Sequence, residues 1–362
     1  MHSYWEQKFW NKKFDFAIVG AGFTGLNVAL NIKKKYTKAK VLVIDKDLRF
    51  SVASTKNAGF ACFGSPSEFL SDIEKMGEEK ATQFLKKRQQ GIELIAKEYS
   101  ARCDHTSCIS HEWFLDEELF EKCLRHLDAL NDLTKSKDAA STTYRVGREN
   151  ILPKGVRNEI LIEGEGQLNP YKLHEALLTS CRDVNIELLS AEISTYDEKT
   201  LFTSSGLRLE SEIIINCSNA LSKKLFDQVD VRPARAQVLI TKEIENLPYN
   251  GNYHMDEGFY YFRNVGKRLL LGGARNEDFE AESTDILGLN SKISQKLEET
   301  LQVLLGNKDF EVEQRWSGIM GFTENKQPNL SKQNGVHHLV GMSGMGVALA
   351  FSISRDLVNQ LD

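Results

Sequence analysis

Residues 14–25 read Phe14-Asp15-Phe16-Ala17-Ile18-Val19-Gly20-Ala21-Gly22-Phe23-Thr24-Gly25, and this stretch decides the fold. A mostly apolar run leads into a GxGxxG turn, and the residues after the turn place apolar side chains at helical spacing. A second apolar run, 41–44, then ends in Asp45. The order strand, glycine turn, helix, strand, acid is typical of a dinucleotide-binding unit.

Each residue type in this unit has a chemical reason. Gly20 allows the tight turn, Gly22 lets the backbone approach a pyrophosphate, and Gly25 lets the helix pack close to the strand. The N-terminus of the helix then faces the phosphates, because its N–H groups lack partners within the helix and favour anions. Asp45 follows Gly25 by twenty residues, the position at which an acid binds a ribose hydroxyl.

A second glycine-rich turn, Gly341-Met342-Ser343-Gly344-Met345-Gly346, lies near the other end of the chain. It leads into a predicted last helix from Gly346 to Leu361, and so offers a second helix N-terminus. One ligand long enough to contact both turns explains the pair, which favours FAD over NAD, since NAD needs one such site. The alternative is a glycine turn that serves packing alone.

Composition excludes several function classes. The 362 residues carry a formal net charge of -5, which gives no basic field for nucleic acid. No apolar run approaches the ~18 residues of a membrane span. The six cysteines lack CxxC spacing and the eight histidines lack HxxxH spacing, which predicts reduced thiols and no metal site. We expect a cytoplasmic protein without a membrane span.

The remaining chain shows no linker and no internal repeat. Helices are expected at about 68–99, 117–133 and 173–181, and strands at 159–162, 186–189, 193–196 and 209–216. Residues 213–215 are three isoleucines, apolar on both faces as a buried parallel strand requires. Residues 231–273 are expected to be rich in strands.

Several further segments carry a resemblance to a known family. They are Ser54-Thr55-Lys56-Asn57-Ala58-Gly59, Gly166-Gln167-Leu168-Asn169-Pro170, Asn216-Cys217-Ser218-Asn219-Ala220, Pro233-Ala234-Arg235-Ala236-Gln237 and Trp316-Ser317-Gly318. With the two glycine turns, they resemble in the right order the motifs of the FAD-dependent D-amino-acid and glycine oxidase superfamily, which includes sarcosine and γ-glutamylputrescine oxidases.

The resemblance implies an α/β fold in which a discontinuous Rossmann-like FAD-binding domain holds an inserted β-rich α+β substrate domain. The expected FAD-binding domain consists of residues 1–75, 150–230 and 310–362, and the expected substrate domain of 76–149 and 231–309.

The resemblance also implies non-covalent FAD, because no cysteine lies in the 310–350 region where sarcosine oxidases attach their flavin. In this family the terminal turn faces the pyrimidine edge of the flavin, where N–H groups of Met345, Gly346 and Val347 would stabilise negative charge. The expected FAD-binding residues are Gly20, Gly22, Phe23, Thr24, Gly25, Asp45, Lys46, Ser54, Thr55, Asn57, Ala58, Gly59, Ile193, Cys217, Ser218, Gly344, Met345, Gly346 and Val347.

The resemblance implies oxidation of the C–N bond of an amine or amino acid, with O2 or an electron carrier as oxidant. Candidate substrate residues are Tyr260, Tyr261, Arg263, Arg275 and Met320. Either arginine could pair with a carboxylate, or simply form a surface salt bridge. Relatives that oxidise amino acids often place an arginine where this chain has 319–322, Ile-Met-Gly-Phe, which favours an amine or an N-substituted substrate. The sequence leaves the catalytic side chains unknown.

Two rival functions remain open at this point. An NAD(P)-dependent Rossmann dehydrogenase would share the first glycine turn, and a flavin-binding regulatory protein without turnover would share both turns. A yellow, FAD-containing protein would exclude the first, and bleaching of its flavin by an amine would exclude the second.

Overall fold

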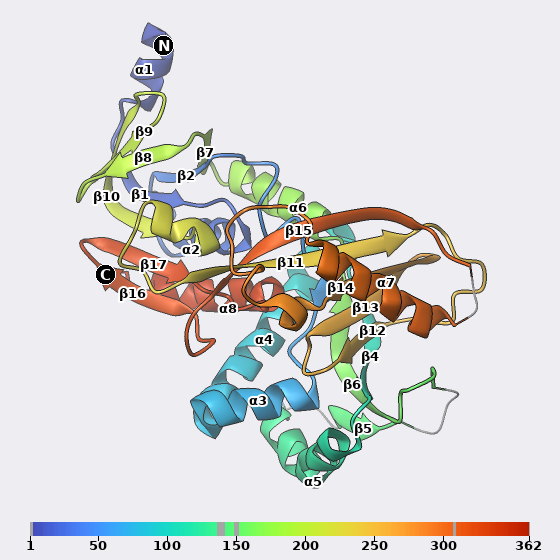
Figure 1. Cartoon of the computed structure of the whole chain (residues 1–362). Helices are drawn as coiled ribbons and strands as arrows, with labels where there is room; N and C mark the ends of the chain where they lie inside the picture. The colour runs from blue at the N-terminus through green and yellow to red at the C-terminus, as the bar shows by residue number, and fades with distance from the viewer. Residues whose placement is uncertain (1–2, 136–141, 148–151, 307–308, 362) are drawn as a thin grey trace. The chain divides into compact units, whose positions relative to one another are not determined.

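The computed structural model describes residues 3–135, 142–147, 152–306 and 309–361 (Figure 1). The chain divides into two compact units. The first unit consists of residues 1–56, 170–234 and 319–362, and the second of residues 57–169 and 235–318.

The first unit is built on a sheet whose central strands run parallel. Its order is β16–β17–β10–β1–β2–β7, and the hairpin of β8 and β9 extends it from β10. The pairs β17–β10, β10–β1, β1–β2 and β2–β7 are parallel. The strands are β1 (Phe14–Val19), β2 (Val41–Asp45), β7 (Glu187–Ser190), β8 (Ile193–Tyr196), β9 (Thr200–Thr203), β10 (Arg208–Asn216), β16 (Asn329–Gln333) and β17 (Val336–Val340).

The first unit contains four α-helices and one 3-10 helix within the described residues. They are α1 (Tyr4–Trp10), α2 (Phe23–Lys35), α6 (Pro170–Asp183), η2 (Asn219–Lys224) and α8 (Gly346–Asn359). Helix α2 packs against both α6 and α8. A side-chain hydrogen bond of 2.9 Å from Asn31 Nδ2 to Ser354 Oγ joins α2 to α8. Two segments more than 300 residues apart in the chain therefore form one helical layer.

The second unit is built on a mostly antiparallel sheet in the order β15–β11–β14–β13–β12–β4–β6–β3, with β5 paired to β6. Residues 232–234 of β11 and 319–322 of β15 cluster with the first unit. Strands β12 and β4 are parallel. The strands are β3 (Phe60–Ala61), β4 (Thr106–Phe114), β5 (Tyr144–Val146), β6 (Asn158–Gln167), β11 (Arg232–Thr241), β12 (Asn252–Met255), β13 (Tyr260–Val265), β14 (Arg268–Gly273) and β15 (Val312–Phe322). The helices are α3 (Pro66–Met76), α4 (Glu78–Tyr99), η1 (Ser100–Arg102), α5 (Glu117–Thr134), η3 (Arg275–Asp278) and α7 (Ser291–Leu305).

The two faces of the second sheet bury different side chains, because successive residues of a strand point to opposite faces. Along β13, Tyr260 and Phe262 enter a large apolar core with Trp113 and with leucines of α7. Tyr261 enters a smaller apolar cluster with Phe60. Neighbouring residues of β13 therefore lie in two different apolar clusters, one on each face of the sheet.

The boundaries of the units differ from the expected domain boundaries. Residues 57–75, 152–169 and 310–318 were expected in the FAD-binding domain but cluster with the second unit, whereas residues 231–234 were expected in the substrate domain but cluster with the first. Strand pairing is the reason: Phe60 and Ala61 of β3 pair with Gln167 and Gly166 of β6, inside the second sheet. The expected boundary at 149/150 falls on residues outside the described part of the chain.

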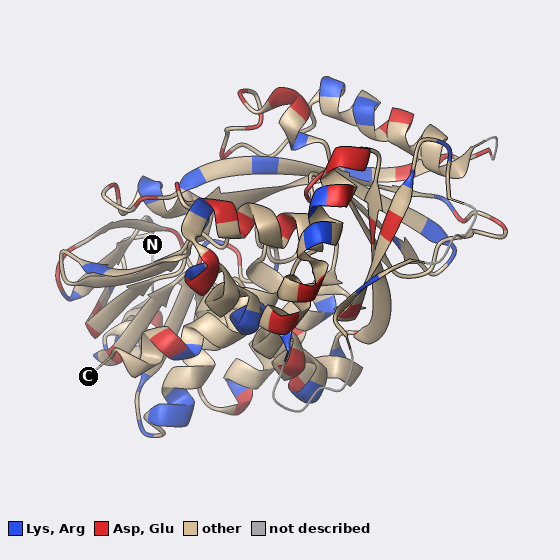
Figure 2. Cartoon of the chain, turned by 90° about the horizontal axis from the view of Figure 1, so that it is seen from below, with Lys and Arg blue, Asp and Glu red and all other residues tan. Residues whose placement is uncertain are grey.

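Charge is distributed without long blocks of one sign. Figure 2 shows Lys and Arg interspersed with Asp and Glu along the helices. Within the described ranges, no helix combines the length and the apolar character that crossing a membrane requires.

Candidate functional site

The carboxyl ends of neighbouring parallel strands in the first unit carry the predicted motifs. The turn that begins at Gly20 follows β1, Asn216 ends β10, and Gly341 follows β17 directly. Since β10 lies between β1 and β17, the two glycine turns are separated by two strand spacings, roughly 10 Å. Ligands of open α/β sheets bind at this edge.

Gly20 and Gly25 are required by close backbone packing. Gly20 has a φ of 110°, and a Cβ there would lie 2.6 Å from the Cys217 carbonyl oxygen. A Cβ on Gly25 would lie 1.8 Å from the Gly20 carbonyl oxygen. Any side chain at either position would force the turn open, so the helix could no longer begin so near the strand.

Helix α2 begins directly at this turn, with Gly22 as its N-cap. Gly22 supplies no side-chain cap, and the first turn of the helix contains no acidic residue. The Phe23 N–H donates to Ser54 Oγ at 3.0 Å, and a Cβ on Gly22 would lie 2.9 Å from the same oxygen. A hydroxyl group and a glycine cradle thus lie at the positive end of the helix, as a diphosphate requires.

Asp45 ends β2 beside the first turn. Its Oδ2 accepts the Ala21 N–H at 2.7 Å, and its Oδ1 accepts the Asp47 N–H at 3.1 Å. Burial raises the pKa of Asp45, and the two backbone hydrogen bonds oppose that rise. The carboxylate is therefore held in a fixed position next to the turn, where a ribose hydroxyl could donate to a remaining lone pair.

Three other predicted FAD-binding residues of the first unit, Thr55, Lys46 and Ile193, make local contacts within the protein. Thr55 Oγ1 donates to the Ser51 carbonyl at 3.0 Å, so the proton of this hydroxyl is used in a hydrogen bond within its own loop. Lys46 is exposed and lies 3.2 Å from Glu192. Ile193 pairs with Thr203 and packs on the core of the first unit.

The turn after β10 connects both glycine turns. The Cys217 N–H donates to the Val19 carbonyl at 2.8 Å, and Cys217 is buried. Asn216 Oδ1 accepts the Ser218 N–H at 3.0 Å. Asn219 Oδ1 accepts the Gly341 N–H at 2.8 Å. The Cys217–Asn219 segment thereby joins the end of β1 to the turn that precedes α8.

The terminal turn begins α8 at Gly346 without a side-chain cap and without an acidic residue in the first turn of the helix. The Met345 N–H donates to the Met342 carbonyl at 2.9 Å, so the donor expected at Met345 already has a partner. Gly346 and Val347 belong to the first turn of α8, whose N–H groups have no acceptor within the helix. Met320 lies beside this turn, its sulfur 3.8 Å from where a Cβ on Gly344 would be.

The chain continues from Thr55 into the loop of Asn57, Ala58 and Gly59, the first residues of the second unit. Asn57 Oδ1 accepts the Gly59 N–H at 2.9 Å. Arg263 Nε donates to the Ala58 carbonyl at 2.6 Å, and Arg263 Nη2 to the Leu168 carbonyl at 3.0 Å. Burial lowers the pKa of Arg263 to about 10, so the guanidinium stays charged at neutral pH.

The predicted substrate residues of the second unit do not share one surface. Tyr260 points into the large core, where its hydroxyl donates to Glu277 Oε1 at 2.9 Å. Tyr261 lies on the opposite face with its ring centroid 5.7 Å from that of Phe60, and burial raises its pKa to about 12. Arg275 is half-buried in η3, with its guanidinium 4.7 Å above the Phe279 ring. Only Tyr261 and Arg263 share a face of the sheet.

A group of buried ionisable residues, absent from the expectations, follows the 57–59 loop. Glu165 Oε1 accepts the Phe63 N–H at 2.9 Å, and His254 lies 3.5 Å from both Glu165 and Glu68. Burial alone would lower the pKa of His254, but Glu165 raises it to about 9. Glu112 accepts hydrogen bonds from Ser65 and Ser67, and burial raises its pKa to about 7. These carboxylates hold residues 63–67 in place.

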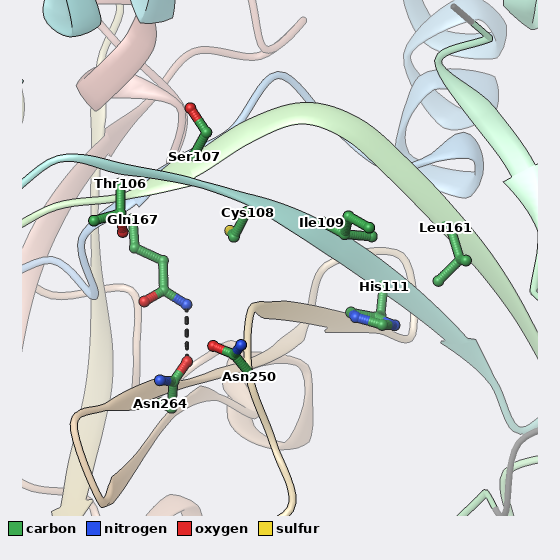
Figure 3. A pocket seen from close by; sticks show the side chains of 9 residues that line it. All are labelled: Thr106, Ser107, Cys108, Ile109, His111, Leu161, Gln167, Asn250 and Asn264. Atoms are coloured by element: carbon green, nitrogen blue, oxygen red, sulfur yellow. Dashed lines mark hydrogen bonds between the residues drawn. The ribbon is translucent and has the colours of Figure 1, made fainter.

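The second unit also contains a pocket of about 510 Å³ that the sequence did not indicate (Figure 3). Its Gln167 Nε2 donates to Asn264 Oδ1 at 3.2 Å, and Gln167 also accepts a hydrogen bond from Arg263. The lining residues are Thr106, Ser107, Cys108, Ile109, His111, Leu161, Gln167, Asn250 and Asn264. The described residues contain no cluster of His, Cys, Asp or Glu that could hold a metal ion.

A parallel sheet that carries a GxGxxG turn, a fixed acid and a second glycine turn on one edge defines a dinucleotide-binding protein. The family model for FAD dependent oxidoreductases, the DAO family, matches residues 15–360, and the chain belongs to this family. The cofactor of the family is FAD, and the protein is an oxidoreductase.

Relatives agree with this assignment. The chain is similar to a probable oxidoreductase, OrdL, of Haemophilus influenzae, at 22% identity over 92% of this chain and 80% of the relative. The glycine oxidase of Geobacillus kaustophilus has a similar structure, with a TM-score of 0.76 at 18% identity over 96% of this chain and 94% of that one. The FAD-bound L-α-glycerophosphate oxidase of Mycoplasma pneumoniae gives 0.72 at 15% identity over 96% and 95%.

Proposed function

We propose that this protein oxidises the C–N bond of an amine or an N-substituted amino acid with non-covalently bound FAD. The FAD would accept a hydride from the carbon next to the nitrogen, and the imine product would hydrolyse in water. The chain itself would bind the cofactor, orient the substrate and keep the reacting carbon in an apolar environment.

One observation carries the proposal. The two glycine turns lie on the same sheet edge, with only β10 between β1 and β17. NAD-type binding needs the first turn alone, whereas the second turn adds an uncapped helix N-terminus within reach of one extended ligand. The first turn, Ser54 and Asp45 would hold the diphosphate and ribose, and α8 would direct its N–H groups at the flavin ring.

Non-covalent attachment is supported by the surroundings of the cysteines. Cys217, the cysteine of the predicted cofactor edge, is buried, and burial raises its pKa well above its usual value. Cys62 packs against the apolar cluster of Phe60, and burial likewise raises its pKa. Neither thiol is poised as a thiolate nucleophile.

The candidate substrate residues on β13 and β15 support an amine as substrate more than an α-amino acid. Residues 319–322 of β15, where the family resemblance often implies an arginine in enzymes that oxidise amino acids, are Ile, Met, Gly and Phe. Arg263 already donates to three protein oxygens. Phe60, Tyr261 and Trp316 form an apolar, aromatic cluster on the face of the second sheet that also carries Arg263. An apolar or aromatic side of the substrate fits such a surface.

The names of the relatives set the range of compounds to test. Glycine, in the name of the Geobacillus relative, carries an amine, whereas α-glycerophosphate, in the name of the Mycoplasma relative, carries none. The screen should therefore contain amines, N-methylated and other N-substituted amino acids, both enantiomers of α-amino acids, and α-glycerophosphate.

The test is anaerobic bleaching of the bound flavin. Purified protein is expected to be yellow, and an amine or N-substituted amino acid should remove the visible flavin absorbance within seconds to minutes. Fast return of the colour on admission of air would indicate an oxidase, and slow return an electron carrier. Bleaching by α-glycerophosphate alone would contradict the C–N assignment. FAD-loaded protein that no compound bleaches would favour the regulatory alternative.

A further inference from the structure

The chain passes from the first unit to the second at 56/57 and back to the first at 169/170. The Arg263 side chain binds the backbone of the second unit close to both of these points in the sequence. Arg263 of β13 donates to the carbonyl of Ala58, two residues after the first crossing, and to that of Leu168, two residues before the second. We propose that Arg263 is a positioning residue for the flavin loop of Asn57, Ala58 and Gly59, and not a ligand of a substrate carboxylate. This inference rests on the proposed function, because it assumes that the loop adjoins the flavin.

Every nitrogen of the Arg263 guanidinium donates a hydrogen bond within the protein. Nε, Nη1 and Nη2 each donate one hydrogen bond, at 2.6 Å to Ala58, 3.2 Å to Gln167 Oε1 and 3.0 Å to Leu168. The planar fork of an arginine can make three such bonds in fixed directions at once, and a lysine cannot. The acceptors are two main-chain carbonyls and one amide, so each bond is charge-assisted on the donor side only.

The surroundings leave little access for a carboxylate. Arg263 is only 8% exposed. Gln167, which accepts from Nη1, is held in turn by Asn264, whose Oδ1 also accepts the Gly251 N–H at 3.0 Å. A substrate carboxylate that took over the fork would leave buried carbonyls without donors, and each such group costs about 1–3 kcal/mol.

The bonds of Arg263 reinforce a backbone link between the same segments. The Leu168 N–H donates to the Gly59 carbonyl at 2.9 Å, and Phe60 pairs with Gln167 in the β3–β6 ladder. Strand β3 has only two residues, so this ladder is short. Arg263 thus adds side-chain hydrogen bonds that tie the flavin loop to the end of β6.

The experiment compares Arg263→Met and Arg263→Lys with the unmodified protein, with Arg268→Met as the matched control. Arg268 lies on the neighbouring strand β14 and forms surface ion pairs with Glu243 and Glu313, so its loss removes an arginine away from the loop. Three readouts are taken: hydrogen exchange of residues 57–62 and 165–169 in the FAD-free protein, the FAD dissociation constant, and the visible spectrum of the bound flavin.

The positioning role predicts faster exchange in both segments and FAD affinity weakened about tenfold or more in Arg263→Met, with a shifted flavin spectrum, because charge-assisted bonds are lost at the loop. Arg263→Lys, which keeps the charge but not the fork, should show smaller changes of the same kind, and it carries the test if Arg263→Met does not fold. Arg268→Met should match the unmodified protein in all three readouts.

A substrate-binding role predicts the opposite pattern. Exchange, FAD affinity and flavin spectrum would then be unchanged in both Arg263 variants, while KM for carboxylate-bearing substrates alone would rise, and this result would overturn the inference. Failure of the proposed function looks different, since the unmodified protein would then bind no FAD. In that case the exchange readout still decides whether Arg263 fixes the loop, because it needs no cofactor.

Discussion

Replacement of Glu112 by glutamine should change how the stability of this protein depends on pH. Glu112 lies on β4, is 1% exposed, and accepts hydrogen bonds from Ser65 and from the hydroxyl and N–H of Ser67. Burial, together with the nearby charge of Glu68, raises its pKa from 4.5 to about 7 despite the hydrogen bonds from the two serines. At a pH between 4.5 and about 7, Glu112 is therefore mostly protonated in the folded protein and mostly ionised in the unfolded chain.

The sign and size of the effect follow from this difference. Between pH 4.5 and about 7 the folded state binds more protons at Glu112 than the unfolded state, so the free energy of unfolding falls as the pH rises through this window. The difference between the two pKa values corresponds to about 3 kcal/mol of stability, present below pH 4.5 and lost by about pH 7. Glutamine has no proton to lose, so the variant should gain about 3 kcal/mol relative to the unmodified protein as the pH rises from 4.5 to 7.5.

Urea unfolding of both proteins at pH 5, 6, 7 and 8 measures this gain directly. The exposed Glu121 of α5 provides a matched control, Glu121→Gln, for any general effect of losing one carboxylate. The difference between Glu112→Gln and the unmodified protein should increase steadily with pH and level off above pH 7. A difference that stays constant from pH 5 to pH 8 would refute the reasoning, since Glu112 would then release its proton as readily in the folded state as in the unfolded one.

Four further predictions concern FAD binding at the sheet edge that carries the two glycine turns. Gly22→Val should yield a folded but colourless protein, because its side chain would meet Ser54 Oγ and fill the diphosphate cradle; a full FAD content would contradict this. Asp45→Ala should weaken FAD binding about ten- to hundredfold, since one hydrogen bond to a charged acceptor contributes about 1.5–3 kcal/mol. Acid denaturation should release all flavin and leave a chain of apoprotein mass in the mass spectrometer. Gly346→Pro should lower the flavin midpoint potential by about 30 mV per 1.4 kcal/mol of lost stabilisation, whereas Gly346→Ala, which keeps the N–H, should shift it less.

Local patterns in the sequence were enough to predict most of the first unit. Strand β1 has the expected bounds of Phe14–Val19, β8 those of Ile193–Tyr196, and α8 begins at the expected Gly346. The triple isoleucine lies in β10, which is parallel to both β1 and β17. Glycine turns and all-apolar runs are strong signals because a single backbone geometry explains each of them.

The second unit was harder to predict for physical reasons. Strand β4 was not expected, because its Thr106–Phe114 sequence mixes exposed polar residues with a buried glutamate and contains a bulge between Cys108 and Ser110. Helix α7 was missed although its leucines recur at helical spacing. The partners of Arg263 lie 95 and 205 residues away in the chain, and no local pattern indicates such contacts.

The arrangement of β1 between β2 and β10 also bears on how the protein is made. Strand β10 begins at Arg208, 189 residues after Val19, and at a synthesis rate of ~5–20 residues per second this corresponds to roughly 10–40 s. During that interval the buried, apolar β1 has no neighbour on its β10 side, and an unpaired strand edge invites aggregation. Strand β17 and helix α8 emerge later still. The nascent chain therefore cannot bring the two glycine turns together on one sheet edge until β17 and α8 have left the ribosome.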